Sequence, residues 1–489
     1  MMTLAKLMEG IEGIRILGDG SIPVRSIRYD SRRVSPGDLF AAIRGEHFDG
    51  TRFIKDAADR GAAAFLVPEG ADRRVEGTYA FAGDVRRALA LASRNLFDDP
   101  SSRLKVVGIT GTNGKTTTSY IIHGILEGNG ISAGLIGTVQ YLVGGQVISA
   151  ARTTPEAPDL YGLMDGMVKA GSSACVMEVS SHALTLSRIQ GVSLEVAVFT
   201  NLTRDHLDFH RDMEAYFRAK AALFETPGVR HRVVNRDDTY GKRLLDELGV
   251  QVLTYGMADA DIVPVGEIRG GDRGTRCTLS TPWGQVEVNT SLPGDFNLYN
   301  VMAATAACGL LGLTSEQIGR GLAVVGNVPG RFEKVDRGQP WAAIVDYAHT
   351  PDALENLLAN TRKLTAGRVL VVFGCGGDRD RSKRPLMGEA AGRLGDVVYV
   401  TSDNPRSEDP SAIIDDIMEG LAHPAGKVVR VEDRREAIAM AVAEAREGDM
   451  VVVAGKGHEN YQIIGQRVLP FSDVDELSHA IGKAAGGTS

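Results

Sequence analysis

Leu104-Lys-Val-Val-Gly-Ile-Thr-Gly-Thr-Asn-Gly-Lys-Thr-Thr117 joins a short apolar strand to a glycine-rich turn, a lysine and two threonines. Residues 116–127 follow with the apolar spacing of a helix. In such an arrangement backbone N–H groups and the helix N-terminus face phosphates, Lys115 supplies a charge and Thr116 can ligate Mg²⁺. The spacing G-x-x-x-x-G-K-[ST] is not met strictly, because Ile109 occupies its first position. The strand and the helix around it still favour ATP binding over an ordinary glycine-rich turn, by a loop that comprises Gly111, Thr112, Asn113, Gly114, Lys115, Thr116 and Thr117.

Working outward from this loop, the sequence predicts an α/β protein of about three domains, because 489 residues are too many for one hydrophobic core. Short apolar segments around a helical pattern predict a small N-terminal α/β domain over residues 1–100. Strand-like runs at 174–177, 196–199 and 232–234 predict a P-loop mononucleotide-binding domain on a mostly parallel sheet, over residues 101–332. Residues 251–292 are interpreted as an antiparallel addition to that domain. Apolar runs at 342–345, 369–373, 396–400 and 450–454 are interpreted as buried strands that alternate with helices. They predict a Rossmann-like, doubly wound C-terminal domain over residues 333–489.

Composition excludes several classes of partner. The 54 basic and 62 acidic residues give a net charge of −8, and no basic tract is present, which argues against binding of duplex nucleic acid. The four cysteines are scattered, with no zinc or redox spacing, as in proteins of a reducing compartment. No apolar run reaches the roughly eighteen residues of a membrane span, and the N-terminus lacks the apolar core of a signal peptide. We expect a cytoplasmic monomer.

Polar side chains follow two of the predicted central strands. Glu178 closes the strand at 174–177, where a carboxylate beside a phosphate loop is well placed for Mg²⁺. The segment from Thr200 to His210 follows the next strand and is dense in groups that bind metal or substrate. The residues themselves do not distinguish among the four candidates in this segment, which are Asp205, His206, Asp208 and His210.

The string Thr110-Gly-Thr-Asn-Gly-Lys-Thr-Thr117 closely resembles the ATP loop of the Mur ligase superfamily, which includes folylpolyglutamate synthases. The resemblance implies an enzyme that joins an amine to a carboxylate through an acyl phosphate, with ATP and Mg²⁺ as cofactors. It also implies that Glu178 and His206 are metal ligands, with Thr116 beside them.

Lys220 lies in an amphipathic helical pattern, Tyr216-Phe-Arg-Ala-Lys-Ala-Ala-Leu-Phe224. From the residues alone it is interpreted as a surface lysine whose stem lies along apolar surface. The string resembles the family segment in which the lysine reacts with CO₂. The resemblance therefore implies a carbamate on Lys220, an anion able to bind a second Mg²⁺.

Further resemblances extend the ATP site. Gly294-Asp-Phe-Asn-Leu-Tyr-Asn300 is similar to the family segment at the nucleotide base, which implicates Asn297 and Asn300. The alternative is that Asp295 or Asn297 only caps a helix. Arg331 resembles the family arginine that reaches the phosphates, and Asp346-Tyr-Ala-His349 resembles the string that completes the ATP site, which implicates Asp346 and His349. The implied catalytic set is Lys115, Glu178, His206, Lys220 and Arg331.

The acceptor amino acid is proposed from Asp403-Asn-Pro-Arg406. This string resembles the signature of family members that add meso-2,6-diaminopimelate, whose second carboxylate an arginine can bind bidentately. The matching family positions that hold this amino acid are Arg379, Asp403, Asn404, Pro405, Arg406, Gly455 and Glu459.

The second implied substrate is UDP-N-acetylmuramoyl-L-alanyl-D-glutamate, a precursor in peptidoglycan biosynthesis. Its implied contacts are Ser31, Arg152, Thr153, Thr154, Ser180 and Arg188. Two residues depart from the pattern of some relatives, Leu186 in place of a glutamine and Arg152 in place of an asparagine. Two other functions are considered: a related ligase that adds lysine or extends a folate polyglutamate chain, and a P-loop ATPase that serves as a switch or a motor.

Overall fold

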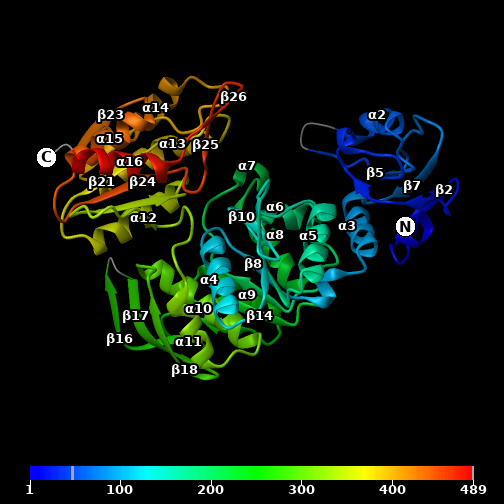
Figure 1. Cartoon of the computed structure of the whole chain (residues 1–489), viewed down its shortest axis with the longest axis horizontal. Helices are drawn as coiled ribbons and strands as arrows, with labels where there is room; N and C mark the ends of the chain where they lie inside the picture. The colour runs from blue at the N-terminus through cyan, green and yellow to red at the C-terminus, as the bar shows by residue number, and fades with distance from the viewer. Residues whose placement is uncertain (46–48, 272–273, 487–489) are drawn as a thin grey trace.

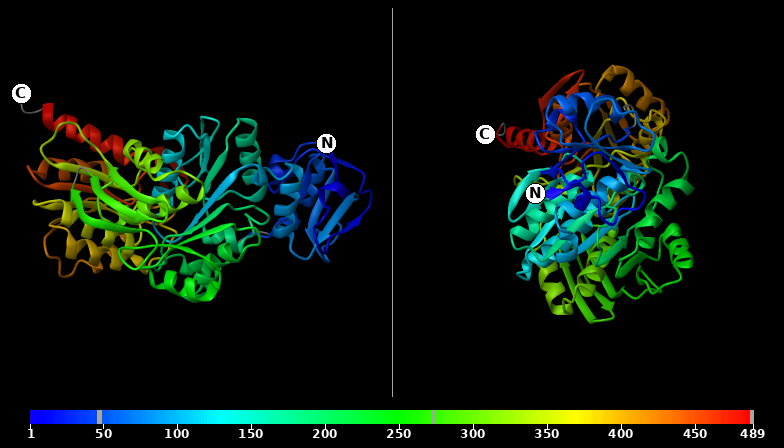
Figure 2. Two further views of the ribbon diagram at one scale, coloured as in Figure 1. Left: turned by 90° about the horizontal axis from the view of Figure 1, so that it is seen from below. Right: turned by 90° about the vertical axis from the view of Figure 1, so that its right-hand side faces the viewer.

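The computed structural model describes residues 1–45, 49–271 and 274–486. Residues 46–48 of the predicted N-terminal domain, 272–273 within the predicted 251–292 segment and 487–489 of the predicted C-terminal domain lie outside the described residues. Three α/β units follow one another along the long axis of the molecule (Figure 1; Figure 2, left). The central unit, cyan to green, lies between the blue N-terminal unit and the yellow-to-red C-terminal unit. The predicted α/β class with three domains is confirmed.

The N-terminal unit is built on a five-stranded sheet in the order β2-β7-β6-β5-β4. Strands β4 to β7 are parallel and β2 is antiparallel to β7. The elements of this unit are β1 (Met2–Thr3), α1 (Leu4–Leu7), β2 (Arg15–Leu17), β3 (Pro23–Val24), β4 (Ile27–Arg28), η1 (Ser31–Arg33), β5 (Leu39–Ala41), η2 (Gly50–Phe53), α2 (Ile54–Asp59), β6 (Ala64–Pro68), β7 (Thr78–Ala82), α3 (Val85–Leu96) and η3 (Pro100–Arg103).

The central unit contains an eight-stranded sheet in the order β11-β10-β9-β12-β8-β13-β14-β15. Six of these strands are parallel, and only the β10–β11 hairpin at one edge is antiparallel. The strands are β8 (Lys105–Thr110), β9 (Ala133–Ile136), β10 (Gln140–Val143), β11 (Gln146–Ser149), β12 (Ala174–Glu178), β13 (Val196–Phe199), β14 (His231–Asn235) and β15 (Leu253–Tyr255). The chain leaves β8 toward β9, returns by β12 and then crosses to β13, so the strand order reverses beside β8. Ligands of such sheets bind at this switch point.

Both faces of the central sheet are covered, as parallel sheets require. Val107 and Ile109 of β8 pack under α4, α10 and α11, while Val106 packs on the opposite face under α5 and α8. The helices of the unit are α4 (Lys115–Gly128), α5 (Ala157–Lys169), α6 (Ser181–Thr185), α7 (Leu207–His210), α8 (Met213–Glu225), α9 (Thr239–Leu248), α10 (Asp295–Leu310) and α11 (Ser315–Val324).

The predicted antiparallel addition at 251–292 is correct only in part. Strand β15 pairs in parallel with β14 and so extends the main sheet. The antiparallel part is a separate sheet of β16 (Val263–Gly271), β17 (Gly274–Thr281) and β18 (Gly284–Thr290). The sequence of such short strands does not show which strand each one pairs with.

The C-terminal unit has a six-stranded sheet in the order β19-β20-β24-β21-β22-β23, parallel except for β19. Along β21, Val369, Val371 and Phe373 pack under α12, α13 and α14, whereas Leu370 and Val372 pack under α15 and α16. The predicted doubly wound arrangement is therefore confirmed. The elements are β19 (Glu333–Lys334), β20 (Ala342–Asp346), α12 (Pro351–Leu364), β21 (Val369–Phe373), α13 (Lys383–Leu394), β22 (Val397–Val400), α14 (Pro410–Glu419), β23 (Lys427–Arg430), α15 (Arg434–Glu444), β24 (Met450–Ala454), β25 (Tyr461–Ile464), β26 (Arg467–Pro470) and α16 (Asp473–Gly486).

Two further observations hold for the described ranges 1–45, 49–271 and 274–486. None of their helices combines the length and the apolar character needed to cross a membrane. All four cysteines are buried as free thiols.

Candidate active site

The phosphate loop runs from the end of β8 to the first turn of α4. Gly111 and Gly114 have φ of +152° and +85°, and a Cβ on Gly111 would lie 1.9 Å from Thr200 Oγ1. Only glycine can therefore occupy position 111. The Thr200 hydroxyl donates to the carbonyl of Asn113 at 2.6 Å, which ties the loop to the end of β13. The backbone groups at the N-terminus of α4 are left facing a cavity, as phosphate binding requires.

Two lysines donate to the same loop. Lys115 Nζ lies 2.9 Å from Gly111 O and 2.8 Å from Thr112 O. Lys220 Nζ lies 2.8 Å from Gly111 O, and its side chain is buried. Within the described residues no carboxylate forms an ion pair with either lysine, so the charge that Lys115 brings to the loop has no counter-charge and is suited to phosphates. The interpretation of Lys220 as a surface lysine is wrong, because α8 turns this residue toward the loop rather than toward solvent.

Burial changes the chemistry of Lys220. Its pKa lies well below the usual range, first because burial disfavours the charged amine and second because Lys115 repels it. A neutral amine is the form that reacts with CO₂, so the environment fits the carbamate that the resemblance implies.

Glu178, at the end of β12, is fully buried among hydroxyl groups. Its Oε2 accepts from Thr116 Oγ1 and from Thr138 Oγ1, both at 3.0 Å, and its Oε1 accepts from the N–H of Thr138 at 2.8 Å. Among the described residues no three His, Cys, Asp or Glu side chains gather closely enough to hold a metal ion by themselves. One carboxylate and one hydroxyl fit Mg²⁺, which usually keeps several waters and takes further oxygens from phosphates.

The segment after β13 separates its four candidate ligands. Asp205 and His206 line the cavity, with His206 in the left-handed backbone region at the start of α7. Burial lowers the pKa of His206, which favours the neutral, ligating imidazole. His210 instead forms a hydrogen bond of 2.8 Å with Ser181 Oγ and stacks on the ring of Tyr216, so its contacts hold α7 against α6 and α8. Asp208 does not line the cavity.

The two asparagines of α10 lie behind the loop. Asn300 lines the cavity and accepts from Thr118 Oγ1 at 3.2 Å, while its amide donates to Asn297 Oδ1 at 3.2 Å. Asn297 itself donates to Pro293 O at 2.8 Å and does not line the cavity. The residue that caps α10 is Gly294, with no side-chain bond, so the alternative of an Asp295 or Asn297 cap is wrong.

The C-terminal unit, together with Arg331 at the end of the central unit, closes the site from the other side. Arg331 Nη2 lies 3.2 Å from Thr116 Oγ1, and its guanidinium lies over the ring of Tyr347, 4.8 Å from the centroid. Asp346 and His349 also line the cavity, and Asp346 accepts the N–H of Phe332 at 2.7 Å. The cavity has a volume of about 430 Å³. The predicted residues that line it are Thr112 to Thr117 of the loop, Thr153, Glu178, Ser180, His206, Lys220, Asn300, Arg331, Asp346 and His349.

A second group of predicted residues meets between the N-terminal and central units. Glu156, which is almost fully buried, pairs with three arginines: Arg86 at 3.1 Å, Arg152 at 3.0 Å and Arg188 at 3.0 Å. Arg188 also donates to Thr154 O at 3.1 Å. Three cations around one carboxylate leave a positive excess that suits an anionic substrate.

Sequence reasoning found only some of these groups. Arg86 lies on α3 of the N-terminal unit, and no local motif marks it or Glu156 as a partner of Arg188. Ser31 lies in η1 of the N-terminal unit and does not line the cavity.

The residues expected to hold the amino acid come together at the carboxyl ends of β22 and β24. Asn404 Nδ2 donates to Glu459 Oε2 at 2.8 Å. A Cβ added to Gly455 would lie 2.8 Å from Asp403 Oδ2, so the two segments touch. Burial raises the pKa of Glu459. Lys456, which follows Gly455 and was not predicted, is fully buried between the carboxylates of Asp403 at 3.5 Å and Glu459 at 3.3 Å.

The two arginines of this group flank Gly376. A Cβ there would lie 2.9 Å from Arg406 Nη1 and 3.9 Å from Arg379 Cγ. Arg406 has φ of +52°, and its Nη1 donates to Gly377 O at 2.7 Å. The carbonyl of Pro405 lies against Gly377, where a Cβ would approach it to 1.9 Å. All seven predicted amino-acid-binding residues are thus carried by three neighbouring loops.

This fold and this site define a P-loop protein in which two further α/β units flank the phosphate-binding unit. The chain belongs to the Mur ligase family. Three family models match it: the Mur ligase middle domain at residues 109–308, the Mur ligase glutamate ligase domain at 330–457, and the Mur ligase family catalytic domain at 23–101.

Several named proteins are similar to this chain over nearly its whole length. The UDP-N-acetylmuramoyl-L-alanyl-D-glutamate–2,6-diaminopimelate ligase of Solibacter usitatus is 45% identical, over 96% of this chain and 97% of its own. The protein of the same name from Geobacillus kaustophilus is 45% identical over 99% of both chains. A solved structure of such a ligase is 32% identical, with a TM-score of 0.70, and covers 99% of both chains.

Proposed function

We propose that this chain joins meso-2,6-diaminopimelate to UDP-N-acetylmuramoyl-L-alanyl-D-glutamate at the expense of ATP, in peptidoglycan biosynthesis. The relatives that are 45% identical carry the name of this reaction. The observation that carries the proposal is the pairing of two sites in one chain. A phosphate loop with free positive charge faces the C-terminal unit, whose loops gather two arginines and two carboxylates suited to an amino acid with a carboxylate and an amine at each end.

In the proposed reaction, the γ-carboxylate of the D-glutamate attacks the γ-phosphorus of ATP, and ADP leaves. The amine of diaminopimelate then attacks the carbonyl of the acyl phosphate, the amide forms, and inorganic phosphate and a proton leave. Lys115 and Arg331 stabilise negative charge on the phosphoryl group during transfer. Thr116, Glu178, His206 and Lys220 as its carbamate would hold Mg²⁺, which supplies Lewis-acid stabilisation of the phosphate oxygens.

The remaining residues bind and orient. Asn300, Asn297, Asp346 and His349 would complete the nucleotide site. The UDP-linked substrate would lie along the seam between the first two units, with its acidic groups near the arginines around Glu156. We propose domain boundaries at 1–100, 101–332 and 333–489, and a monomer that acts in the cytoplasm.

The test is phosphate release by the purified protein with ATP, Mg²⁺ and the UDP-linked dipeptide, in the presence of meso-diaminopimelate or of lysine. We expect release with diaminopimelate and little with lysine. Arg406→Ala should raise the KM for diaminopimelate about 10- to 100-fold, because bonds to a charged group are lost. Arg381→Ala is the matched control, since this exposed arginine on a neighbouring loop pairs with Glu408 at 2.8 Å and is outside the predicted set.

Equal activity with lysine would indicate a lysine-adding relative instead. ADP formation that does not depend on any amino acid would favour a P-loop ATPase and contradict the ligase. An Arg406→Ala variant with an unchanged KM would remove Arg406 from amino-acid recognition.

A further inference from the structure

Asp352 is a carboxylate of the C-terminal unit that contacts two loops of the central unit. Its Oδ2 accepts from Asn113 Nδ2 at 3.0 Å and from Thr203 Oγ1 at 2.9 Å. Asn113 belongs to the phosphate loop, and Thr203 belongs to the segment that carries His206. The same two residues also approach each other, with Asn113 Nδ2 3.4 Å from Thr203 Oγ1. One oxygen atom thus closes a triangle of hydrogen bonds across the domain boundary.

The local sequence explains why Asp352 is free to make these contacts. It lies in the first turn of α12, where the helix dipole favours an acidic residue. Thr350 already caps this helix, because its side chain accepts from the N–H of Ala353. Asp352 therefore has no capping role in its own helix, and its carboxylate lines the cavity instead.

The two partner residues are themselves held by the central unit. The N–H of Asn113 donates to Asn201 Oδ1 at 2.9 Å, and the N–H of Thr203 donates to Thr112 Oγ1 at 3.0 Å. The backbones of both loops are therefore placed before the C-terminal unit docks, and what docking adds is an acceptor for their side chains. A charged acceptor makes stronger hydrogen bonds than a neutral one.

We propose that Asp352 is a positioning residue through which docking of the C-terminal unit fixes the phosphate loop and the His206 loop in one arrangement. The proposal rests on the proposed function in that it takes ATP to be the ligand of this loop. The Asp352 carboxylate acts through Asn113 and Thr203, so the proposal requires only that residue 352 place a hydrogen-bond acceptor where Oδ2 lies.

Two substitutions separate this role from a chemical one. Asp352→Ala removes the acceptor and should lower kcat/KM for ATP about 30-fold, as expected for two hydrogen bonds to a charged group. Asp352→Asn can place its own Oδ1 where Oδ2 lies and should stay within about fivefold of the unchanged protein. If Asp352→Ala stays within about twofold of the unchanged protein, or Asp352→Asn loses as much as Asp352→Ala, positioning by hydrogen bonds is overturned.

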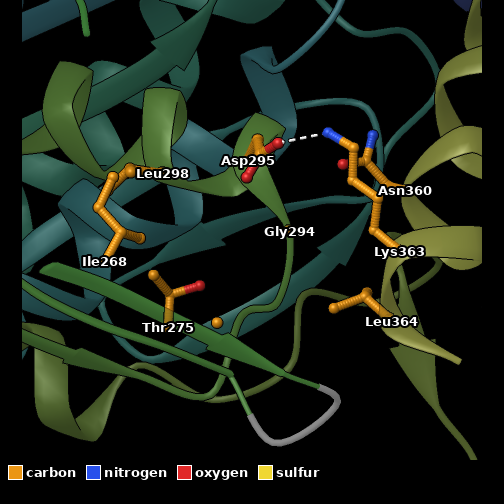
Figure 3. Close-up of a pocket in the computed structure, with 9 residues that line it drawn as sticks. Ile268, Thr275, Gly294, Asp295, Leu298, Asn360, Lys363 and Leu364 are labelled. Carbon is orange, nitrogen blue, oxygen red and sulfur yellow. Dashed lines mark hydrogen bonds and ion pairs between the residues drawn. The ribbon is translucent and has the colours of Figure 1, made fainter.

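A second contact across the same boundary supplies the control. Lys363, further along α12, pairs with Asp295 at the start of α10 at 2.6 Å beside a smaller groove of about 180 Å³ (Figure 3). This ion pair is exposed and lies outside the residues that line the active-site cavity. Lys363→Ala should change kcat/KM less than about twofold. If it is as harmful as Asp352→Ala, the contact serves docking in general, and the specific role of Asp352 is overturned.

A double-mutant cycle tests the route through Thr203. If Asp352 acts through this hydroxyl, adding Thr203→Val to Asp352→Ala should cost little more than Asp352→Ala alone, whereas independent losses would multiply. The affinity for a non-hydrolysable ATP analogue, measured without the UDP-linked dipeptide or an amino acid, should show the same coupling. Multiplying losses in both measurements overturn the proposal.

The two proposals fail in different ways. If the unchanged protein uses another amino acid, the proposed function fails, while the nucleotide-affinity cycle still tests Asp352. If diaminopimelate is added as proposed but the cycle shows no coupling, only the role of Asp352 fails. The melting temperatures of all variants, which should agree within a few degrees, exclude misfolding as the cause.

Discussion

Arg434→Met would remove one partner of an ion pair that has no access to solvent. Arg434, at the start of α15, forms two bonds of 2.7 Å to the carboxylate of Asp473 at the start of α16, and both side chains are 0% exposed. The substitution leaves a buried carboxylate without its counter-charge, which costs about 3–5 kcal/mol. The neighbouring pair Arg435–Glu476 joins the same two helices at 2.7 Å, but Arg435 is 65% exposed. Arg435→Met should therefore cost no more than about 1 kcal/mol.

Urea unfolding of the C-terminal unit can measure this difference. The chain has two tryptophans, and Trp341 packs against the cluster that contains Leu477 of α16. In a Trp283→Phe background, Trp341 fluorescence reports on this unit alone. With a denaturant dependence of about 2 kcal/mol per molar urea, Arg434→Met should lower the midpoint by about 2 M. The control Arg435→Met should lower it by less than about 0.5 M.

The same pair also supports the amino-acid site. Arg434 donates to Ala454 O at 2.9 Å and lies 3.4 Å from Ser402 O, the residues just before Gly455 and Asp403. In conditions where the variant is folded, its KM for the amino acid should rise while its affinity for ATP is unchanged. Equal midpoints for Arg434→Met and Arg435→Met would refute the reasoning. So would a double variant with Asp473→Leu that is no more stable than Arg434→Met alone, because removing the stranded charge should restore part of the loss.

Three further outcomes are expected. Gly114→Ala should weaken ATP binding in a nucleotide titration at least about tenfold, because the added Cβ would lie 2.4 Å from Asn300 Oδ1. The control is Gly130→Ala, which should not weaken it: Gly130 also has a left-handed backbone, but a Cβ there would meet no atom within 4 Å. Burial raises the pKa of Glu459, so as the pH falls this carboxylate becomes protonated earlier than an ordinary glutamate. The KM for the amino acid should therefore rise as the pH falls. A KM that does not change with pH would contradict a role of Glu459 in amino-acid binding. Lys220→Met should abolish phosphate release without lowering the melting temperature at pH 7. The pKa of this buried amine is lowered in the folded protein, so at pH 7 the unfolded chain binds a proton that the folded chain does not, which costs stability; this cost shrinks as the pH rises toward the unfolded pKa of about 10.4. A markedly lower melting temperature of the variant would contradict this.

Local patterns predicted most of the fold. The runs Val196–Phe199, Val369–Phe373 and Met450–Ala454 are strands with the predicted limits, because central parallel strands are buried on both faces and stand out as continuous apolar segments. The β10–β11 hairpin was not predicted. Strand β11 is exposed throughout and β10 is mostly half-buried, so their edge position imposes no continuous apolar pattern.

In the candidate site, too, contiguous segments could be predicted from the sequence, and residues placed by tertiary packing could not. The phosphate loop is one contiguous segment with a backbone geometry that its glycines dictate, so it could be predicted from sequence. The environment of Lys220 could not, because the pattern around it is that of any amphipathic helix. Its burial depends on the packing of α8 against a loop more than a hundred residues earlier. Asp352 and Arg86 share this property, since each acts across a domain boundary.

Side chains of opposite charge contact the phosphate loop at two places beside the boundary between the central and C-terminal units. Arg331 contacts Thr116 at the start of α4, and Asp352 contacts Asn113 in the turn before it. These two contacts favour the observed orientation of the C-terminal unit, because another orientation would leave the Arg331 guanidinium or the Asp352 carboxylate without these hydrogen-bond partners. The phosphates of ATP would place negative charge between Lys115 and Arg331, which would attract Arg331, and with it the C-terminal unit that follows, toward the loop. In that orientation the loop that carries Glu459 lies against the segment of Arg331, since a Cβ on Gly330 would lie 2.1 Å from His458 N. We therefore expect nucleotide binding to precede productive binding of the amino acid, so that the acyl phosphate forms only where the amine can reach it and water is excluded.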